Sequence, residues 1–212
     1  MTNKEIVRSC IDCGSCSCDG SSGNYPEFCP TTDISQELVE QVRDIYIEDD
    51  ENSQVAINAA LVEAEGYGKL TRVEEIAEFA HKMGFETIGI ATCVGLIKEA
   101  RAAASVFRTK GFKVYSIGCK VAAQPKTSIG IDKKCESSGV NMCNPILQAK
   151  LLNNCETNLN VVVGLCVGHD SLFYKYSEAL VTTLVTKDRV LAHNPCAALY
   201  QLDSYYSRIL EK

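Results

Sequence analysis

VVVGLCVGHD, residues 161–170, is the stretch on which the prediction of this chain's fold depends. It begins as an apolar, β-branched run, which is typical of a strand buried on both faces. The run stops at Cys166, which has a glycine two residues away on either side, and passes directly into His169 and Asp170. We therefore predict a buried strand that delivers a thiol, an imidazole and a carboxylate at its carboxyl end.

Two further strand-like runs end in the same way, at Cys93 and at Cys119. An alanine-rich amphipathic segment from residue 96 to about residue 110 separates them, which is long enough for a crossover between parallel strands. Because the carboxyl ends of parallel strands meet at one edge of a sheet, we expect Cys93, Cys119 and Cys166 to lie along the same edge. Cys143 precedes Pro145, a residue suited to the first position of a helix, and can join them there.

With a fourth strand expected over residues 180–187, the chain is predicted to adopt an α/β fold with a largely parallel four-stranded sheet flanked by helices. The expected division is a cysteine-rich arm (1–32), a helical N-terminal segment (33–84) and the α/β core (85–212). A helix is predicted over about residues 34–47, with a capping arrangement of Asp33 and Gln36 at its start. A second helix is expected to end at about residues 66–68, and a third to run from the capping box at Thr71 to Gly84. Residues 121–142 read as a long irregular loop, a lid or a ligand carrier. A last helix from Pro195 is expected to bury a stripe made of Leu199, Leu202, Tyr206 and either Ile209 or Leu210.

Composition excludes some function classes. The formal net charge is −6 over 212 residues, without a basic stripe, which argues against nucleic acid as a partner. No apolar run approaches the ~20 residues that a membrane helix needs, and Met1 leads into no apolar signal core, so we expect no membrane and a cytoplasmic location. For 12 cysteines in such a chain, metal ligation or thiol chemistry is a better explanation than disulfides.

The N-terminal arm is rich in glycine, serine and aspartate and cannot form an apolar core of its own. Cys10 and Cys13 have the spacing of a zinc knuckle. Together with Cys16 and the distant Cys29 they also echo the ferredoxin run that binds an iron–sulfur cube. Spacing leaves both options open, and we predict Cys10, Cys13, Cys18 and Cys29 as the ligands, with Cys16 as the spare.

The predicted cluster at the sheet edge has three competing uses. Cys93, Cys119, Cys143 and Cys166 can bind zinc or a 4Fe–4S cluster as cofactor, with His169 as a replacement ligand or as a donor to a ligand. Alternatively, a thiol-dependent enzyme would use Cys166 as nucleophile, His169 as general acid and base, Asp170 to orient it, and Lys120 to receive a small anionic molecule. The third use is structural, with the sulfurs packed beneath the loops.

Further polar residues are expected at the same sheet edge. Asp188, Arg189 and His193 follow the fourth strand and can add a polar wall to the same edge. No phosphate-binding loop, nucleophile elbow or HExxH motif occurs in the chain, which counts against the enzyme. Cys135, Cys155 and Cys196 have no comparable setting and are interpreted as incidental.

Several of these motifs together resemble the DUF1847 family of bacteria and archaea, over nearly the whole chain. The resemblance implies metal binding and no established reaction. We therefore predict a metal-binding protein, redox-linked through a partner protein, with one site in the arm and one at the sheet edge. The alternatives are the thiol-dependent enzyme and an arm that is a zinc-stabilised docking surface for a protein. The matching stretches are Phe28-Cys29-Pro30, Ala91-Thr92-Cys93, Cys143-Asn144-Pro145-Ile146, residues 164–173 (GLCVGHDSLF), residues 187–191 (KDRVL) and His193-Asn194-Pro195.

Overall fold

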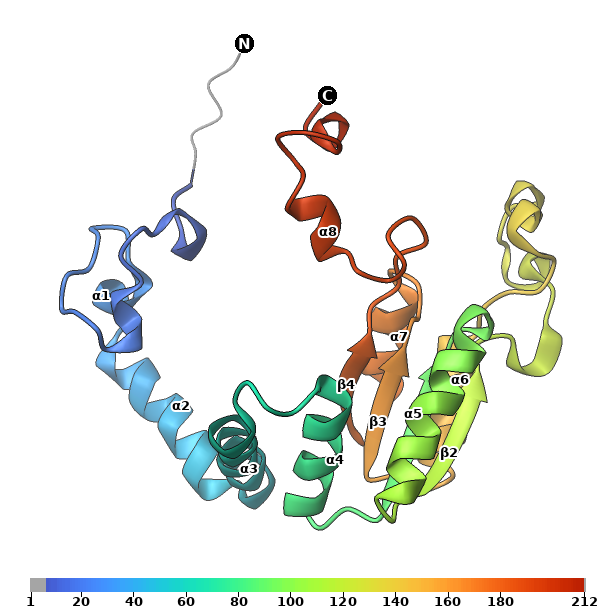
Figure 1. Cartoon of the computed structure of the whole chain (residues 1–212), viewed down its shortest axis with the longest axis horizontal. Helices are drawn as coiled ribbons and strands as arrows, with labels where there is room; N and C mark the ends of the chain where they lie inside the picture. Colours follow the sequence, from blue (N-terminus) through green and yellow to red (C-terminus); the bar gives the residue numbers. More distant parts are fainter. Residues whose placement is uncertain (1–6, 212) are drawn as a thin grey trace. The chain divides into compact units, whose positions relative to one another are not determined.

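The structure, a computed structural model, describes residues 7–211, and the chain divides into two compact units whose boundary falls between Ile57 and Asn58. Figure 1 shows the helices and strands of both units. The predicted three-part division stays a prediction.

The first unit holds the arm and the helices that follow it. Its elements are η1 (Cys10–Asp12), η2 (Ser17–Asp19), α1 (Pro30–Asp33), α2 (Gln36–Glu48) and the first part of α3 (Asp50–Gly66). The N-cap of α2 is Ser35, whose hydroxyl accepts a hydrogen bond from the Leu38 N–H at 3.3 Å, so the predicted capping role of Asp33 is wrong. Asp33 instead closes the preceding single turn, α1.

The second unit is built on a four-stranded sheet in the order β2-β1-β3-β4, with every neighbouring pair parallel. This confirms the predicted α/β fold. Figure 1 shows the arrowheads of the labelled strands at the same end of the unit. The strands are β1 (Thr87–Thr92), β2 (Lys113–Gly118), β3 (Leu159–Val163) and β4 (Leu180–Val185).

Burial explains the central position of β1 and β3. Every residue of β3 is buried, and so is every residue of β1 except the first, as expected for strands covered by helices on both faces. β2 and β4 are only partly buried, in keeping with their places at the two edges of the sheet.

Helices cover both faces of the sheet. On one face, α4 (Arg72–Lys82) and α5 (Ile97–Thr109) pack through Ile76, Ala104 and Phe107 against the strands. On the other, α6 (Pro145–Asn153) and α7 (His169–Tyr176) pack through Leu152 and Phe173. The predicted capping box at the start of α4 is confirmed, since Thr71 N–H donates to Glu74 Oε2 at 2.8 Å.

The C-terminal segment differs from the prediction. Only α8 (Cys196–Leu199) and the turn η7 (Ser207–Ile209) are helical, so the long last helix is wrong. Leu199 and Leu210 are 63% and 69% exposed, so the expected apolar stripe has no surface to pack against. A short helix without such packing is marginal in water, which explains why the pattern alone misleads here.

No helix within residues 7–211 has both the length and the apolar character needed to cross a membrane.

Gly89 tests the packing of β1. It pairs with Asn160 of β3, and a Cβ at this position would lie 2.0 Å from the Asn160 Oδ1 and 3.1 Å from both Leu152 methyl carbons. Gly89→Ala should therefore lower the free energy of unfolding by about 1–3 kcal/mol, measured by urea denaturation. Gly118→Ala is the matched control, because its Cβ would meet only Val94 at an ordinary 3.7 Å. Equal stability of the Gly89 variant and the wild type would contradict this packing.

Candidate functional site

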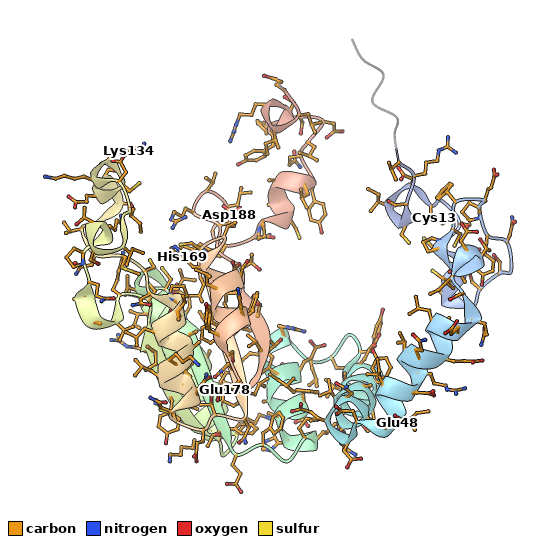
Figure 2. The ribbon with its side chains drawn as sticks, turned by 180° about the vertical axis from the view of Figure 1, so that it is seen from behind. Cys13, Glu48, Lys134, His169, Glu178 and Asp188 are labelled. Atoms are coloured by element: carbon orange, nitrogen blue, oxygen red, sulfur yellow. The ribbon has the colours of Figure 1, made fainter. Side chains whose placement is uncertain are left out.

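The sheet edge at the carboxyl ends of the strands gathers the predicted chemistry. Cys93 and Cys119 directly follow β1 and β2, and Cys166 follows β3 after a bend at Gly164. Gly164 has a φ of 66°, and a Cβ there would lie 2.5 Å from a Leu96 methyl carbon, so this bend requires glycine. Figure 2 shows His169 and Asp188 at this end of the unit and Glu178 at the opposite end.

Cys119 and Cys143 are in direct contact, with their sulfur atoms 3.7 Å apart. The backbone brings them together, because the Asn144 N–H donates to the Cys119 carbonyl at 2.8 Å. Asn144 is also the N-cap of α6, and its side chain accepts from the Leu147 N–H at 3.0 Å. Helix capping and strand ending thus fix the two sulfurs relative to each other.

Cys93 extends this pair. Its sulfur accepts from the Gly95 N–H and from the Lys187 ammonium, both at 3.4 Å, and its thiol interacts with that of Cys119. The Val94 N–H in turn donates to the Cys119 sulfur at 3.4 Å. Backbone N–H groups and a cation directed at sulfur favour the thiolate form.

The protonation of the cluster follows from these contacts. The neighbouring Cys119 thiol lowers the pKa of Cys93 to about 5, with the Gly95 N–H and Lys187 adding to the effect against the cost of burial. Cys119 and then His169 lower the pKa of Cys143 to about 4. The two neighbouring sulfurs raise the pKa of Cys119, and Cys143 raises that of His169. The site therefore favours thiolates at Cys93 and Cys143 and a retained proton on Cys119, and it makes His169 easier to protonate than a free imidazole.

Cys166 has a different contact. Its sulfur lies 2.8 Å from Nη2 of Arg189, which comes from the turn after β4. Asp188 orders that turn, since its Oδ1 accepts from the Val190 and Leu191 N–H groups at 2.8 Å. His193 closes it by accepting from the Asp188 N–H at 3.2 Å, with its own φ at 65°. A strained, hydrogen-bonded turn thus holds a guanidinium against a thiol.

Lys120 and the long loop lie beside the cluster. The Lys120 ammonium donates to the carbonyl of Asn141 and so ties the two ends of the loop together. Within the loop, the buried Lys126 donates to the Cys135 carbonyl and, at 2.8 Å, to the Ser138 hydroxyl. The irregular loop predicted over 121–142 is present, as the short turns η4 (Val121–Ala123), η5 (Lys126–Ile129) and η6 (Lys133–Ser138).

The arm presents its cysteines on turns. The Cys13 N–H donates to the Cys10 carbonyl at 3.2 Å, which closes the turn between these two residues. The Ser15 hydroxyl, 3.5 Å from the sulfur, lowers the pKa of the Cys13 thiol. Of residues 7–32, only Ser17 and Cys29 are buried. The arm therefore has almost no apolar core.

Within residues 7–211, neither the sheet edge nor the arm has its side chains already arranged around a metal position. Across the part of the chain that the structure describes, no three His, Cys, Asp or Glu side chains stand ready to hold a metal ion. Cys119 and Cys143 nevertheless have the separation that one tetrahedral zinc ion demands, since two sulfurs bound to it at 2.3 Å are about 3.8 Å apart.

The family model "Protein of unknown function (DUF1847)" matches residues 29–184. The chain belongs to the DUF1847 family. It is also 44% identical over 179 residues to an uncharacterised protein of Methanocaldococcus jannaschii, covering 84% of this chain and 89% of that protein. The matched residues include all four predicted cysteines of the sheet edge, whereas Cys10, Cys13 and Cys18 of the arm precede them.

The predicted residues and the observed contacts agree only in part. The structure brings together Cys93, Cys119, Cys143 and His169, while Cys166 contacts Arg189 and Asp170 accepts from the Ser171 N–H at 2.8 Å. Lys187 is a contact that the prediction missed, although its place just after β4 could have indicated it.

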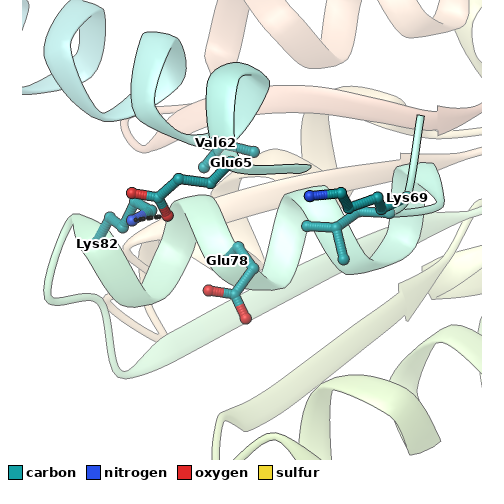
Figure 3. Close-up of a pocket in the computed structure, with 6 residues that line it drawn as sticks. Val62, Glu65, Lys69, Glu78 and Lys82 are labelled. Carbon is teal, nitrogen blue, oxygen red and sulfur yellow. Dashed lines mark hydrogen bonds and ion pairs between the residues drawn. The ribbon is translucent and has the colours of Figure 1, made fainter. Parts of the chain in front are cut away.

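A pocket elsewhere in the second unit offers less chemistry (Figure 3). An ion pair between Lys82 and Glu65, at 2.8 Å, crosses it. No cysteine or histidine lines this pocket, and we assign it no role. Its lining residues are Val62, Glu65, Lys69, Leu70, Glu78 and Lys82.

Alkylation tests the protonation of the cluster. An ordinary thiol with a pKa of 9.0 gains thiolate about tenfold per pH unit below that value. Because the pKa of Cys143 is lowered to about 4, its labelling by iodoacetamide in the metal-free protein should be nearly constant from pH 6 to 8. The test is how the labelling rate depends on pH and not how large the rate is, because the nucleophilicity of a thiolate falls as its pKa falls. Glutathione under the same conditions is the control, and a tenfold rise per unit at Cys143 would contradict the assignment.

Proposed function

We propose that this chain binds a single thiophilic metal ion such as zinc at the sheet edge, through Cys93, Cys119, Cys143 and His169. The observation that carries the proposal is the 3.7 Å separation of the Cys119 and Cys143 sulfurs. In a 4Fe–4S cluster each cysteine binds a different iron atom, so the ligand sulfurs are held farther apart than this. The contact distance therefore supports one shared ion over a cube.

The surroundings suit such an ion. Three thiolates and an imidazole around a divalent cation carry a net charge of about −1. Lys187 lies against Cys93, and Lys120 acts electrostatically on Cys143 and His169, so positive charge is already placed to balance this excess. The N–H groups of Val94 and Gly95 supply the hydrogen bonds that bound thiolates accept. Cys93 and His169 need only close around the pair that is already in contact.

We propose a second ion in the arm, held by Cys10, Cys13, Cys18 and Cys29. The closed turn between the first two cysteines and the near absence of buried side chains support it, because a segment without a core needs another source of order. Cys16 caps the turn η2 with a φ of 49° and remains the spare.

Metal counting tests both sites. Full-length protein purified without oxygen and loaded with zinc should contain about two ions per chain, measured by elemental analysis after removal of free metal. Cys143→Ser should lower the count by about one and leave the arm loaded, whereas Cys13→Ser should empty the arm alone.

Two matched variants sharpen this test. Cys155→Ser is the control, because Cys155 is half-buried and lies outside both proposed sets. Cys166→Ser distinguishes the two possible ligand sets. The variant should keep the ion if His169 is the fourth ligand, and should lose it if Cys166 is the fourth ligand, as predicted from sequence. An unchanged count in Cys143→Ser, or brown protein with acid-labile sulfide, would overturn the single-ion site.

A second candidate function is thiol chemistry on a small anionic molecule, favoured by the contact between Arg189 and Cys166 at 2.8 Å. Within residues 7–211, neither Arg189 nor Lys187 forms an ion pair with a carboxylate. Both cations instead face sulfurs, from where they could receive an anion. On this proposal Cys166 is the nucleophile and Arg189 the group that receives the anion.

Two reagents of similar size but different charge test this candidate. The ratio of the iodoacetate rate to the iodoacetamide rate should be higher at Cys166 than for free glutathione, because Arg189 attracts the carboxylate. Arg189→Gln should lower this ratio several-fold at low salt, by peptide mass spectrometry, and Lys150→Gln should not, since Lys150 pairs with Glu178 at the exposed surface. A ratio that is the same in the Arg189 variant and the wild type would exclude an anion site here.

A further inference from the structure

Gln148 is a buried polar residue next to the sulfur cluster. It lies in the middle of α6 and is 0% exposed. Its side-chain Nε2 donates two hydrogen bonds, to the Ile117 carbonyl at 2.7 Å and to the Thr92 carbonyl at 3.2 Å. A helix side chain thus binds the ends of two strands at once.

The two carbonyls belong to the segments that deliver the cysteines. Thr92 immediately precedes Cys93, and Ile117 lies two residues before Cys119. The Thr92 carbonyl also accepts from the Cys119 N–H at 2.8 Å, so it joins β1 to β2 where both strands end. Cys143 lies two residues before α6, the helix that bears Gln148. One amide therefore connects all three cysteine-bearing segments.

The other half of the amide is unsatisfied. Gln148 Oε1 is buried and has no hydrogen-bond partner among the residues that the structure describes. A buried acceptor without a partner costs free energy, which leucine or methionine of similar size would avoid. Packing alone therefore does not explain a glutamine here, whereas the two donated hydrogen bonds at the strand ends do.

We propose that Gln148 is the positioning residue of the sulfur cluster, whose amide holds the ends of β1, β2 and α6 so that Cys93, Cys119 and Cys143 converge. The inference rests on the proposed metal site and deepens it. Gln148 does not touch the ion; it acts through the backbone of the ligands.

Cobalt binding tests the inference in a Cys13→Ser background, because the proposed ion site of the arm would otherwise add to the signal. Thiolate-to-cobalt charge-transfer absorption reports sulfur coordination directly, and competition with a chelator gives the dissociation constant. Gln148→Leu keeps the volume but loses both donors, so it should weaken binding by about 10–100-fold, as loss of supporting groups around metal ligands does. Gln148→Glu keeps the shape, but an ionised carboxylate cannot donate to the two carbonyls, so it should also reduce affinity.

A matched control lies on the same helix. The Asn153 side chain also bridges backbone groups, donating to the Tyr176 carbonyl at 3.0 Å and accepting from the Glu178 N–H at 3.1 Å, but at the other end of α6. Asn153→Leu should leave cobalt affinity and the charge-transfer spectrum unchanged. If Gln148→Leu folds and binds cobalt like the Cys13→Ser parent, or if Asn153→Leu weakens binding equally, the positioning role is overturned.

A second readout needs no metal. Diamide takes two electrons and two protons from a pair of thiols and leaves a disulfide, so the rate of the Cys119–Cys143 link in metal-free protein reports how well the sulfurs are aligned. Gln148→Leu should slow this link by about tenfold or more, by mass spectrometry, because small misplacements have large effects on rate. If the Cys13→Ser protein binds no cobalt, the proposed function of the sheet edge fails, while an unchanged disulfide rate in Gln148→Leu would overturn the inference separately.

Discussion

The parallel pairing of β1 with both β2 and β3 is the constraint on which the sulfur cluster depends. Parallel strands end at the same edge, so residues far apart in the sequence, such as Cys93 and Cys119, are delivered to one place. Burial of β1 and β3 between two layers of helices supports this pairing, because a shift of one residue in register would exchange the side chains that pack against the two layers. The stability of the core and the geometry of the site are thus two consequences of one arrangement.

Electrostatics then determine what the cluster can do. Adjacent thiolates repel each other, and they can coexist only where donors and cations compensate. In a chain with a net charge of −6, the sheet edge gathers Lys120, Lys187 and Arg189, and two of these side chains contact sulfur directly. Three cations are therefore placed where the negative charge of thiolates needs compensation, which suits a thiolate-rich site.

The sequence predicts this fold through patterns of burial. Apolar runs that end in or near cysteine predict β1, β2 and β3, their parallel direction and their shared edge, and the structure contains all of these. The pattern fails at the C-terminus, where Leu199 recurs at helical spacing but remains 63% exposed, since periodicity does not say whether a partner surface exists. It also cannot show pairwise contacts such as that of Cys93 with Lys187, 94 residues apart, or the role of Gln148, because these depend on side-chain direction in the folded core.

The most direct measurement of the central claim is an anomalous difference map, recorded at the zinc edge from crystals of the anaerobically purified, full-length protein. Our account predicts one peak at the carboxyl edge of the sheet, about 2.3 Å from the sulfurs of Cys93, Cys119 and Cys143. A map of zinc-loaded protein without a peak at this edge, or with the ion bound away from these sulfurs, would contradict it.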